Sequence, residues 1–322
     1  MLFRQGDRLN SPSDIYVHLR TREKTIEKIE CGGEVVVDGA RELKVPYKSL
    51  EVCLGLSFKE FEQQGWEKVA DVYHECFGQI TPKAALVLVD DAMIKQNDKV
   101  LDVACGPGYV AAITSEKGGI VTGIDFSSAM IQRAKTLHPE ITFQVMDAEE
   151  LQFSNGIFDV VLMNFGILHL AKPEQAIAEA FRVLKPGGKF LFTVWDRPIR
   201  SKAFDFIMSA LKEEGDLNLS LPEGPDFFKF SDPSTSKEIL SNTGFDAIEA
   251  SSIEFTWTLS SAEELFQAFY KGGIRIGGIL RAQKPEAIRK IIEKLEQKTK
   301  PFQREGRLEI PISVMFFKAE KV

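Results

Sequence analysis

The sequence has few of the residues that mark a secreted, metal-binding or nucleic-acid-binding protein. Among its 322 residues are only four cysteines, and no two of them have the C-x-x-C spacing of zinc and redox motifs. We expect reduced thiols and no metal site, as is usual in the cytoplasm. The formal net charge is −7, from 40 basic and 47 acidic residues. Because nucleic-acid binding needs a basic surface, we predict a cytoplasmic protein with no nucleic-acid partner.

Long hydrophobic runs are also missing. The longest apolar stretch, near residues 160–171, is interrupted by Asn164 and His169 and is too short to cross a bilayer. The first residues, 1–7, contain no apolar segment of signal-peptide length. We therefore predict no membrane span. Tryptophan and tyrosine are scarce, at 3 and 5, but phenylalanine is frequent, at 24, which predicts apolar core packing and apolar pocket walls.

The chain divides into two parts of different character. Residues 1–52 contain short β-type runs separated by turn signals, including the hairpin signal Asp38-Gly39. We predict a small β-rich module here, whose end, 45–52, resembles the last strands of SH3-like barrels. This module either packs on the main domain or docks a partner. Residues 53–322 are predicted to form one further domain.

Between residues 99 and 195, apolar runs of strand length alternate with segments of helical periodicity, and two more strands are predicted near the C-terminus. The predicted strands are 99–103, 120–124, 142–146, 160–164, 189–195, 247–259 and 308–319. This alternation is typical of the α/β class and predicts a doubly wound, seven-stranded, Rossmann-like sheet. Helical periods also cover 58–75. The segment 197–245, rich in proline and phenylalanine, predicts an inserted cap.

The stretch 100–108, Val-Leu-Asp-Val-Ala-Cys-Gly-Pro-Gly, is the most informative part of the sequence. An apolar strand contains Asp102, and Gly106 and Gly108 follow at a turn where bare backbone can approach a ligand. The next segment, 109–116, is predicted to be a helix whose N-terminal amides face that ligand. The arrangement predicts a site for a nucleotide-containing cofactor.

Two cofactor classes fit these glycines. Gly106-x-Gly108-x-x-Ala111, with Asp125 further along, matches the dinucleotide fingerprint, so an NAD-dependent oxidoreductase is one alternative. Asp102 argues against it, because a buried carboxylate would repel a pyrophosphate. A cationic amino group on the ligand would instead satisfy this carboxylate.

Acidic residues recur where successive predicted strands end. Asp125 ends the second strand and Asp147 follows the third, at similar spacing along the chain. Asp125 can accept hydrogen bonds from two ribose hydroxyls, and Asp147 from an exocyclic adenine amine. Asn164 and His169 follow the fourth strand, at the edge where such sheets bind ligands. The series fits an adenosine that carries a positive centre and no phosphates.

Together with the turn Arg182-Val-Leu-Lys-Pro-Gly-Gly before the fifth strand, these motifs resemble the class I S-adenosylmethionine-dependent methyltransferases. The likeness is to the small-molecule group that includes the ubiquinone/menaquinone-biosynthesis C-methyltransferases. It covers about 66–196 well, the later strands loosely, and 1–52 not at all. Ala104 is a mild departure, because the family often has glycine there.

The resemblance implies S-adenosyl-L-methionine as the cofactor and assigns its contacts. The methionine end would be held by Asp102 and by the backbone of Ala104, Gly106 and Gly108, and the ribose by Asp125. The other implied contacts are Phe126 and Met130 against the adenine, Asp147 and Ala148 at its edge, the backbone near Asn164 at the amino group, and Tyr73 over the carboxylate.

The acceptor is less well defined by the sequence. Aromatic residues in the cap segment and at Trp257, Phe266, Phe269 and Tyr270 predict a water-excluding, apolar pocket. We predict methylation of a small hydrophobic or aromatic metabolite on O, C or N. His169 is the candidate base for an acceptor that must lose a proton, since histidine titrates near neutrality. Hydrogen bonding within its own loop is the alternative role.

The sequence leaves open whether the protein is catalytic and what its oligomeric state is. A non-catalytic S-adenosylmethionine-binding protein, with residues 1–52 docking a partner, is the second alternative to a methyltransferase. The oligomeric state is undetermined, with a homodimer as one candidate.

Overall fold

A computed structural model describes residues 56–219 and 221–322, together with the backbone of five short strands nearer the N-terminus. Two compact units are distinguished, Met1–Ser57 with Ser220–Pro222, and the rest of the chain. The strands of the first unit are β1 (Asp14–Ile15), β2 (Leu19–Arg20), β3 (Thr25–Ile26), β4 (Lys28–Glu30) and β5 (Val35–Val36). Most of the predicted SH3-like module lies outside the described residues, so it stays a prediction.

The second unit is built on one sheet in the order β11-β13-β10-β9-β6-β7-β8. Its strands are β6 (Lys99–Val103), β7 (Ile120–Asp125), β8 (Thr142–Val145), β9 (Phe158–Asn164), β10 (Leu184–Trp195), β11 (Phe245–Leu259) and β13 (Arg307–Lys321). A short β12 (Gln303–Arg304) pairs with β13. The strands from β8 to β10 are parallel, and β13 runs antiparallel between β10 and β11. The predicted doubly wound, seven-stranded sheet is confirmed.

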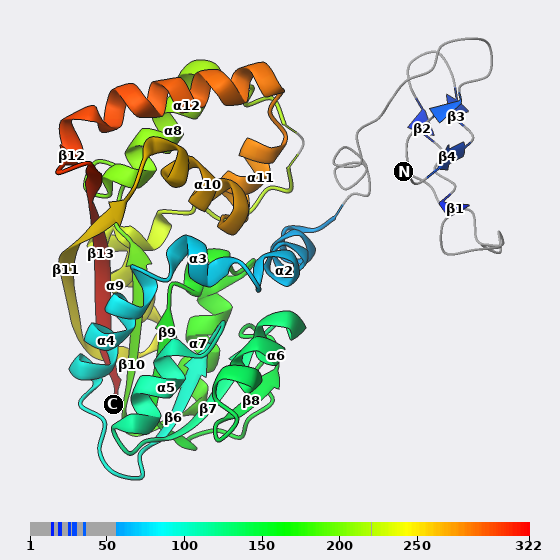
Figure 1. The fold of residues 1–322 in the computed structure, drawn as a ribbon. Helices are drawn as coiled ribbons and strands as arrows, with labels where there is room; N and C mark the ends of the chain where they lie inside the picture. Colours follow the sequence, from blue (N-terminus) through cyan, green and yellow to red (C-terminus); the bar gives the residue numbers. More distant parts are fainter. Residues whose placement is uncertain are drawn as a thin grey trace. The chain divides into compact units, whose positions relative to one another are not determined.

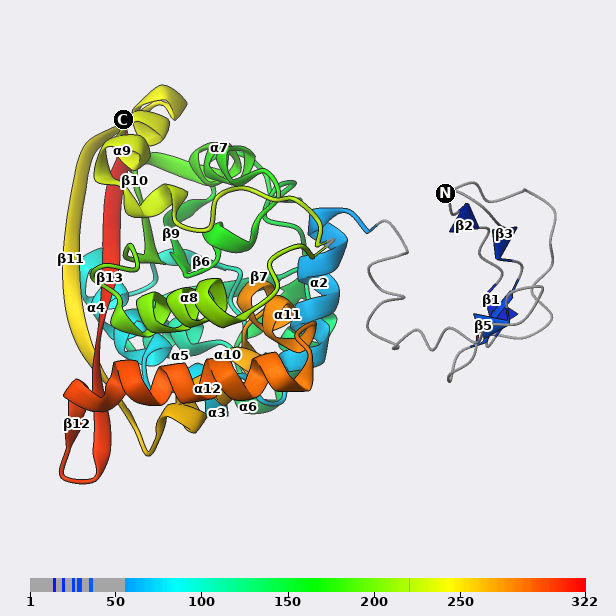
Figure 2. The same ribbon diagram turned by 90° about the horizontal axis from the view of Figure 1, so that it is seen from above.

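Helices cover both faces of this sheet, as Figure 2 shows. On one face lie α4 (Thr81–Ala92), α5 (Tyr109–Glu116) and α6 (Ser128–Leu137), and on the other α7 (Pro173–Val183) and α9 (Pro233–Thr243). The central strands β6 and β9 are therefore buried on both sides. This burial explains why their sequences are nearly continuous apolar runs.

A further helical layer lies beyond the carboxyl ends of the parallel strands, at the top of Figure 1. It contains α8 (Lys202–Glu214), α10 (Ala262–Gly272), α11 (Arg275–Arg281) and α12 (Pro285–Thr299). The long strands β11 and β13 connect this layer to the sheet. Trp195 at the end of β10 pairs with Val314, whereas β13 continues to pair with β11 as far as Leu308.

This layer differs from the predicted cap at residues 197–245. Within that range only α8 belongs to it, because α9 packs against α7 and β11 on the face of the sheet. Most of the layer comes instead from residues 262–299. Proline and phenylalanine density indicated where the alternation of strands and helices stops, but not against which surface each helix would pack.

Two helices precede α4 and the sheet in the chain. The helical periodicity at 58–75 is divided into α2 (Phe58–Val69) and α3 (Tyr73–Phe77), with a turn between them. α2 packs against α6, and α3 packs against α10. Both lie beside the carboxyl edge of the sheet in Figure 1, so they are placed to form walls of a site there.

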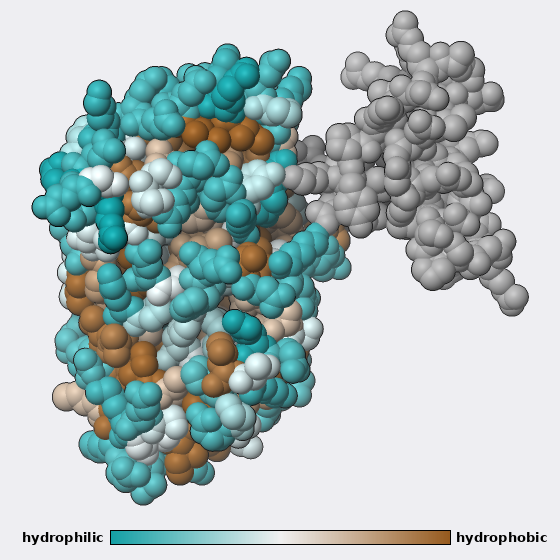
Figure 3. Space-filling view, in the orientation of Figure 1, coloured by the Kyte–Doolittle hydropathy of each residue, from teal (hydrophilic) through white to brown (hydrophobic). Residues whose placement is uncertain are grey.

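In the part of the chain that the structure describes, no helix is long and apolar enough to cross a membrane. In the view of Figure 3 the described surface is mainly hydrophilic, with apolar side chains in small separate groups. Single exposed apolar residues, such as Met93 and Ile199, are ordinary on protein surfaces.

Candidate active site

A cavity of about 1190 Å³, counted out to its open mouth, lies at the carboxyl edge of the sheet. It is the crevice where doubly wound sheets bind ligands. Except for Gly108, every residue predicted for the site lines it, namely Tyr73, Asp102, Ala104, Gly106, Asp125, Phe126, Met130, Asp147, Ala148, Asn164 and His169. The structure therefore brings the predicted residues together, while the role of each remains a proposal.

The glycine loop adopts a backbone that favours glycine. Gly108 has φ of +90° and caps the N-terminus of α5, and a Cβ there would lie 3.0 Å from His138 and Phe143. It shapes the loop without lining the cavity. Ala104, the departure from the family pattern, has φ of +53°. A left-handed conformation costs a non-glycine residue about 1–2 kcal/mol, which explains the advantage of glycine at this position.

Two buried carboxylates stand on either side of this loop. Asp102 is 1% exposed and accepts a hydrogen bond from the backbone N–H of Ala111 at 3.0 Å. Asp125 is 6% exposed and accepts from the N–H groups of Gly106 and Ser127, each at 2.9 Å. Neither forms an ion pair with any residue in the described part of the chain.

Burial dominates the electrostatics of this pair. It raises the pKa of Asp102 well above its usual range, against the hydrogen bond from Ala111, and the nearby charge of Asp125 adds to the effect. Burial also raises the pKa of Asp125 to about 6, although the N–H groups of Ser127 and Gly106 lower it. A cation bound between the two carboxylates would relieve both costs.

At the next strand end, Asp147 is held by a residue of α2. Lys59 forms an ion pair with Asp147 and a second one, at 3.2 Å, with Glu149. Partial burial lowers the pKa of Lys59, but these two carboxylates raise it above its ordinary value overall. Asp147 Oδ1 also accepts from the N–H of Glu149 at 2.9 Å. The loop after β8 is thereby tied to α2.

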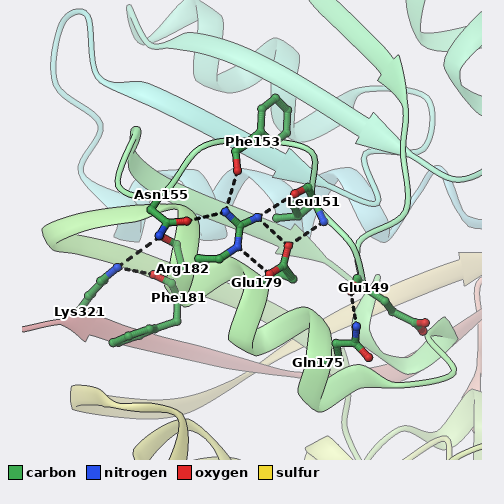
Figure 4. A network of polar contacts seen from close by, with 9 residues as sticks. All are labelled: Glu149, Leu151, Phe153, Asn155, Gln175, Glu179, Phe181, Arg182 and Lys321. Carbon is green, nitrogen blue, oxygen red and sulfur yellow. Dashed lines mark hydrogen bonds and ion pairs between the residues drawn. The ribbon is translucent and has the colours of Figure 1, made fainter.

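Arg182, the first residue of the predicted turn, lies near the end of α7 and has a structural role beside this loop, shown in Figure 4. Its guanidinium donates to the backbone oxygens of Leu151 and Phe153, each at 2.7 Å, and to Asn155 Oδ1 at 2.8 Å. Glu179 holds the guanidinium in place and accepts from the N–H of Leu151 at 2.8 Å. The motif therefore orders the segment that follows Asp147 and Ala148.

Helix α2 makes further polar contacts around the predicted adenine end. Gln63 Nε2 donates to the carbonyl of Phe126 at 3.0 Å. Glu67 accepts from the N–H groups of Ser128 at 2.6 Å and Ala129 at 3.0 Å, at the start of α6. A carboxylate there satisfies N–H groups that have no partner within the helix. These contacts fix α2 over one side of the cavity.

Asn164 and the loop after it connect the sheet to α4. Asn164 Nδ2 donates to the carbonyl of Thr81 at 3.1 Å, and Thr193 donates to Asn164 Oδ1 at 2.7 Å. Its side chain is thus occupied within the protein, and contact of the backbone here with a ligand stays a prediction. Phe165 follows with φ of +58°.

His169 lies in a network that joins three elements. Its Nδ1 is 2.8 Å from Glu62 Oε2 on α2, and Arg275 Nε on α11 donates to Glu62 Oε1 at 2.8 Å. His169 itself ends the short helix η1 (Ile167–His169). The ring of Trp66 contacts the imidazole edge-on, with centroids 4.8 Å apart. The bond to Glu62, rather than one within the loop, orients the histidine.

Tyrosines line the rim near α3. The ring of Tyr73 packs on Trp66, with centroids 5.4 Å apart, and burial raises the pKa of its hydroxyl above the ordinary range. The hydroxyl of Tyr109 is 2.6 Å from His74 Nδ1, and burial raises the pKa of Tyr109 to about 12. Both hydroxyls are therefore neutral at physiological pH.

The other half of the cavity is aromatic. Phe165 stacks on Trp195 with centroids 4.0 Å apart, and Phe204 contacts Trp195 at 5.4 Å, Phe269 at 5.1 Å and Phe227 at 5.8 Å. All five line the cavity. Of the four aromatic residues predicted near the C-terminus for this pocket, only Phe269 is among the lining residues. Trp257 and Phe266 are buried, at 1% and 2% exposed, outside the lining set.

Several contributors were missed by the sequence analysis. Glu62, Lys59 and Arg275 are charged residues whose partners lie far away in the chain, 107 residues in the case of Glu62 and His169. Their local sequence carries no motif. The one signal for Glu62 was its place within the helical period of Phe58 and Trp66, where a charged residue would be buried.

Comparisons with known proteins agree with this geometry. Residues 101–192 match the family model of a methyltransferase domain. A demethylmenaquinone methyltransferase of Paenarthrobacter aurescens is 33% identical over 129 residues, which cover 39% of this chain and 51% of that protein. A ubiquinone/menaquinone biosynthesis C-methyltransferase of Serratia proteamaculans is 28% identical over 179 residues, covering 50% and 71%. The chain spans about half the length of the first of these relatives.

Solved structures share the fold. Phosphoethanolamine N-methyltransferase 2 of Haemonchus contortus superposes with a TM-score of 0.53 and 21% identity, covering 87% of this chain and 62% of that one. The cyclase SpnF superposes with a TM-score of 0.54 and 17% identity, covering 83% and 98%.

The family match and the relatives together confirm the resemblance to methyltransferases. This chain carries a methyltransferase domain at residues 101–192.

Proposed function

We propose that this protein transfers a methyl group from S-adenosyl-L-methionine to a small hydrophobic or aromatic metabolite. The observation that carries the proposal is one cavity with two unlike halves, one with the buried carboxylates Asp102 and Asp125, the other with aromatic walls. The first half suits a cationic adenosyl compound, and the second suits an apolar acceptor.

The residues at the acidic half fit this cofactor. Each oxygen of Asp125 already accepts one backbone N–H and, as a carboxylate oxygen, has a further lone pair for a ribose hydroxyl. Asp102 would bind the amino group of the methionine end, and Asp147 and Ala148 the edge of the adenine. When bound, S-adenosylmethionine supplies a methyl group activated by its sulfonium charge. The protein's main contribution is to hold the acceptor in line with that group and to exclude water.

The two alternatives are less well supported. A dinucleotide would bring its pyrophosphate next to the negative recess of Asp102 and Asp125, and the family match is to methyltransferases. A non-catalytic binding protein would have no need of the aromatic half. Cytoplasmic location and the lack of a nucleic-acid partner stay predictions from cysteine content and net charge.

Binding and transfer can be tested separately. We expect titration calorimetry of the full chain to show binding of S-adenosylhomocysteine and none of NAD. Incubation with methyl-labelled S-adenosylmethionine and a metabolite extract should then label an apolar small molecule. Binding of NAD without binding of S-adenosylhomocysteine would overturn the proposal. Cofactor binding with no labelled product would favour the non-catalytic alternative.

A further inference from the structure

We infer that His169, positioned by Glu62 and Arg275, accepts a proton from the methyl acceptor, and that the acceptor is therefore a neutral phenol or enol methylated on its oxygen. The inference rests on the proposed methyl transfer and narrows its substrate class. It assigns His169 as the base and Glu62 and Arg275 as positioning residues.

The hydrogen bonds of Glu62 determine which nitrogen of His169 carries the proton in the neutral ring. Glu62 is fully buried and pairs with Arg275, which is cationic in proteins, so we take it as a carboxylate. A carboxylate only accepts, so Nδ1 of His169 must be the donor at 2.8 Å. In the neutral ring the lone pair is then on Nε2, the nitrogen available as a base. His169 lines the cavity and its side chain is 15% exposed.

Further contacts hold the network in place. The guanidinium of Arg275 also donates to the backbone oxygens of Pro225 at 2.6 Å and Leu168 at 2.5 Å, the second next to His169 in the chain. The rings of Trp66 and Phe227 pack edge-on against the imidazole, with centroids 4.8 and 6.0 Å away. A base held in one orientation loses little entropy when the acceptor binds.

The charges of the lining residues indicate a neutral acceptor. Among the described residues around the cavity, the charged side chains are Asp102, Asp125, Asp147 and Arg275, besides the titratable His169. The three acids are at the strand ends of the cofactor half. Arg275 is neutralised by Glu62, so no cation remains for a carboxylate or phosphate on the acceptor. The aromatic half likewise offers no acid to an ammonium group.

A neutral hydroxyl becomes a strong nucleophile only as it loses its proton, which is the task of a base. The O–H bond of the acceptor breaks and the proton moves to Nε2 of His169. The oxygen's electron pair forms the bond to the methyl carbon, while the sulfur–carbon bond breaks and its pair stays on sulfur. The imidazolium, stabilised by Glu62 through Nδ1–H, later releases the proton to water.

The first test needs no acceptor. In ¹⁵N-labelled full-length protein, at a pH where the ring is neutral, we expect the His169 resonances to show a proton on Nδ1 and none on Nε2. Glu62→Gln should give a mixture of the two tautomers, because an amide can both donate and accept. Glu116→Gln, at the exposed end of α5 outside the cavity, is the matched control. A wild-type ring protonated on Nε2 would overturn the assignment of His169 as the base.

The second test measures methyl transfer to a series of substituted phenols and enols of increasing acidity. His169→Gln should lower kcat by about 10²–10⁴-fold, with little change in KM or in S-adenosylhomocysteine affinity. The loss should shrink for the more acidic phenols, which are ionised in solution and need no base. Glu62→Gln should show the same trend with a smaller loss.

The outcomes distinguish a failure of this inference from a failure of the proposed function. A wild-type protein that methylates compounds in the extract but no phenol or enol would overturn this inference and leave the proposed function standing. A loss in His169→Gln that is equal for all phenols would reduce the histidine to a structural role. A failure to label anything at all would count against the proposed function itself.

Discussion

The two halves of the cavity are assembled from the chain in different ways. The acidic half comes from the ends of three neighbouring strands, with Asp102 in β6, Asp125 at the end of β7 and Asp147 just after β8. The aromatic half collects five residues from a strand end, helices and loops between positions 165 and 269 of the chain, namely Phe165, Trp195, Phe204, Phe227 and Phe269.

This difference shows which parts of a site can be predicted from residues that are close together in the sequence. Consecutive parallel strands place their carboxyl ends at one edge of the sheet, so a repeated residue type there becomes a cluster through topology alone. No such rule applies to the helical layer of α8, α10, α11 and α12, because each of these helices packs where its apolar side meets another apolar surface. Binding of the cofactor should therefore depend on single residues, and binding of the acceptor should depend on packing among many residues.

The largest effect should come from the acidic half. Replacing Asp125 with Asn removes the charge and places an amide N–H₂ opposite the N–H donors of Gly106 and Ser127. Hydrogen bonds to charged groups are worth about 1.5–3 kcal/mol each, so we expect the affinity for S-adenosylhomocysteine to fall about 100-fold or more. Calorimetry measures it. Asp90→Asn, an exposed acid on α4, should leave the affinity unchanged.

Substitutions in the acceptor half of the cavity should change the KM for the acceptor. Phe204 is 2% exposed, and Phe204→Ala should lower the free energy of unfolding by about 3–5 kcal/mol and raise the acceptor KM about tenfold, with cofactor affinity kept. Phe245→Ala, equally buried but outside the cavity, is the matched control and should cost similar stability without the change in KM. Equal KM values in the two variants would contradict the division into halves.

The pH dependence of binding should follow Asp125. Because burial raises its pKa to about 6, lowering the pH from 7 to 5 protonates it, and the affinity for the cofactor should fall about tenfold. Binding near pH 6 should release protons, seen as a dependence of the calorimetric enthalpy on the buffer. An enthalpy that is the same in buffers of different ionisation heat would contradict this assignment.

The same raised pKa acts on stability in the opposite sense. In the absence of cofactor the folded state binds this proton more tightly than the unfolded chain, in which the pKa of aspartate is about 3.9. Considered alone, Asp125 therefore lowers the free energy of unfolding as the pH rises from about 4 to 6. The contrast between binding and stability distinguishes this carboxyl from one held in an ion pair.

The smallest effect is expected at the partly exposed ion pair that ties α2 to the site. The side chain of Lys59 is 39% exposed, and such pairs contribute about 0.2–1 kcal/mol. Lys59→Gln should weaken S-adenosylhomocysteine binding by less than about fivefold, mainly through faster dissociation, measured by stopped-flow. Lys135→Gln on the exposed side of α6 is the control. A larger loss would show that α2 contributes more to the cofactor half than its contacts indicate.

Features that depend on residues close together in the sequence were predicted better than features that depend on distant residues. The strands, the glycine loop and the acids at the strand ends were predicted because each depends on residues within one strand–helix unit. The cap was assigned to residues 197–245, although most of it is formed by α10, α11 and α12. The network around His169 was missed because His169 and Glu62 are 107 residues apart, Glu62 and Arg275 are 213 residues apart, and no local pattern links them.

By itself the sequence determined the sheet and the residues that line the acidic half, and it indicated the cofactor that we propose, because hydrophobic periodicity and turn geometry act over a few residues. Only the tertiary structure decided which helices cover the cavity, which aromatic rings form its walls and how Glu62 orients His169. Those features depend on contacts between side chains of segments that are far apart in the sequence. These contacts are stabilised by burial and by complementary shape, so the neighbouring residues in the sequence carry no signal of them.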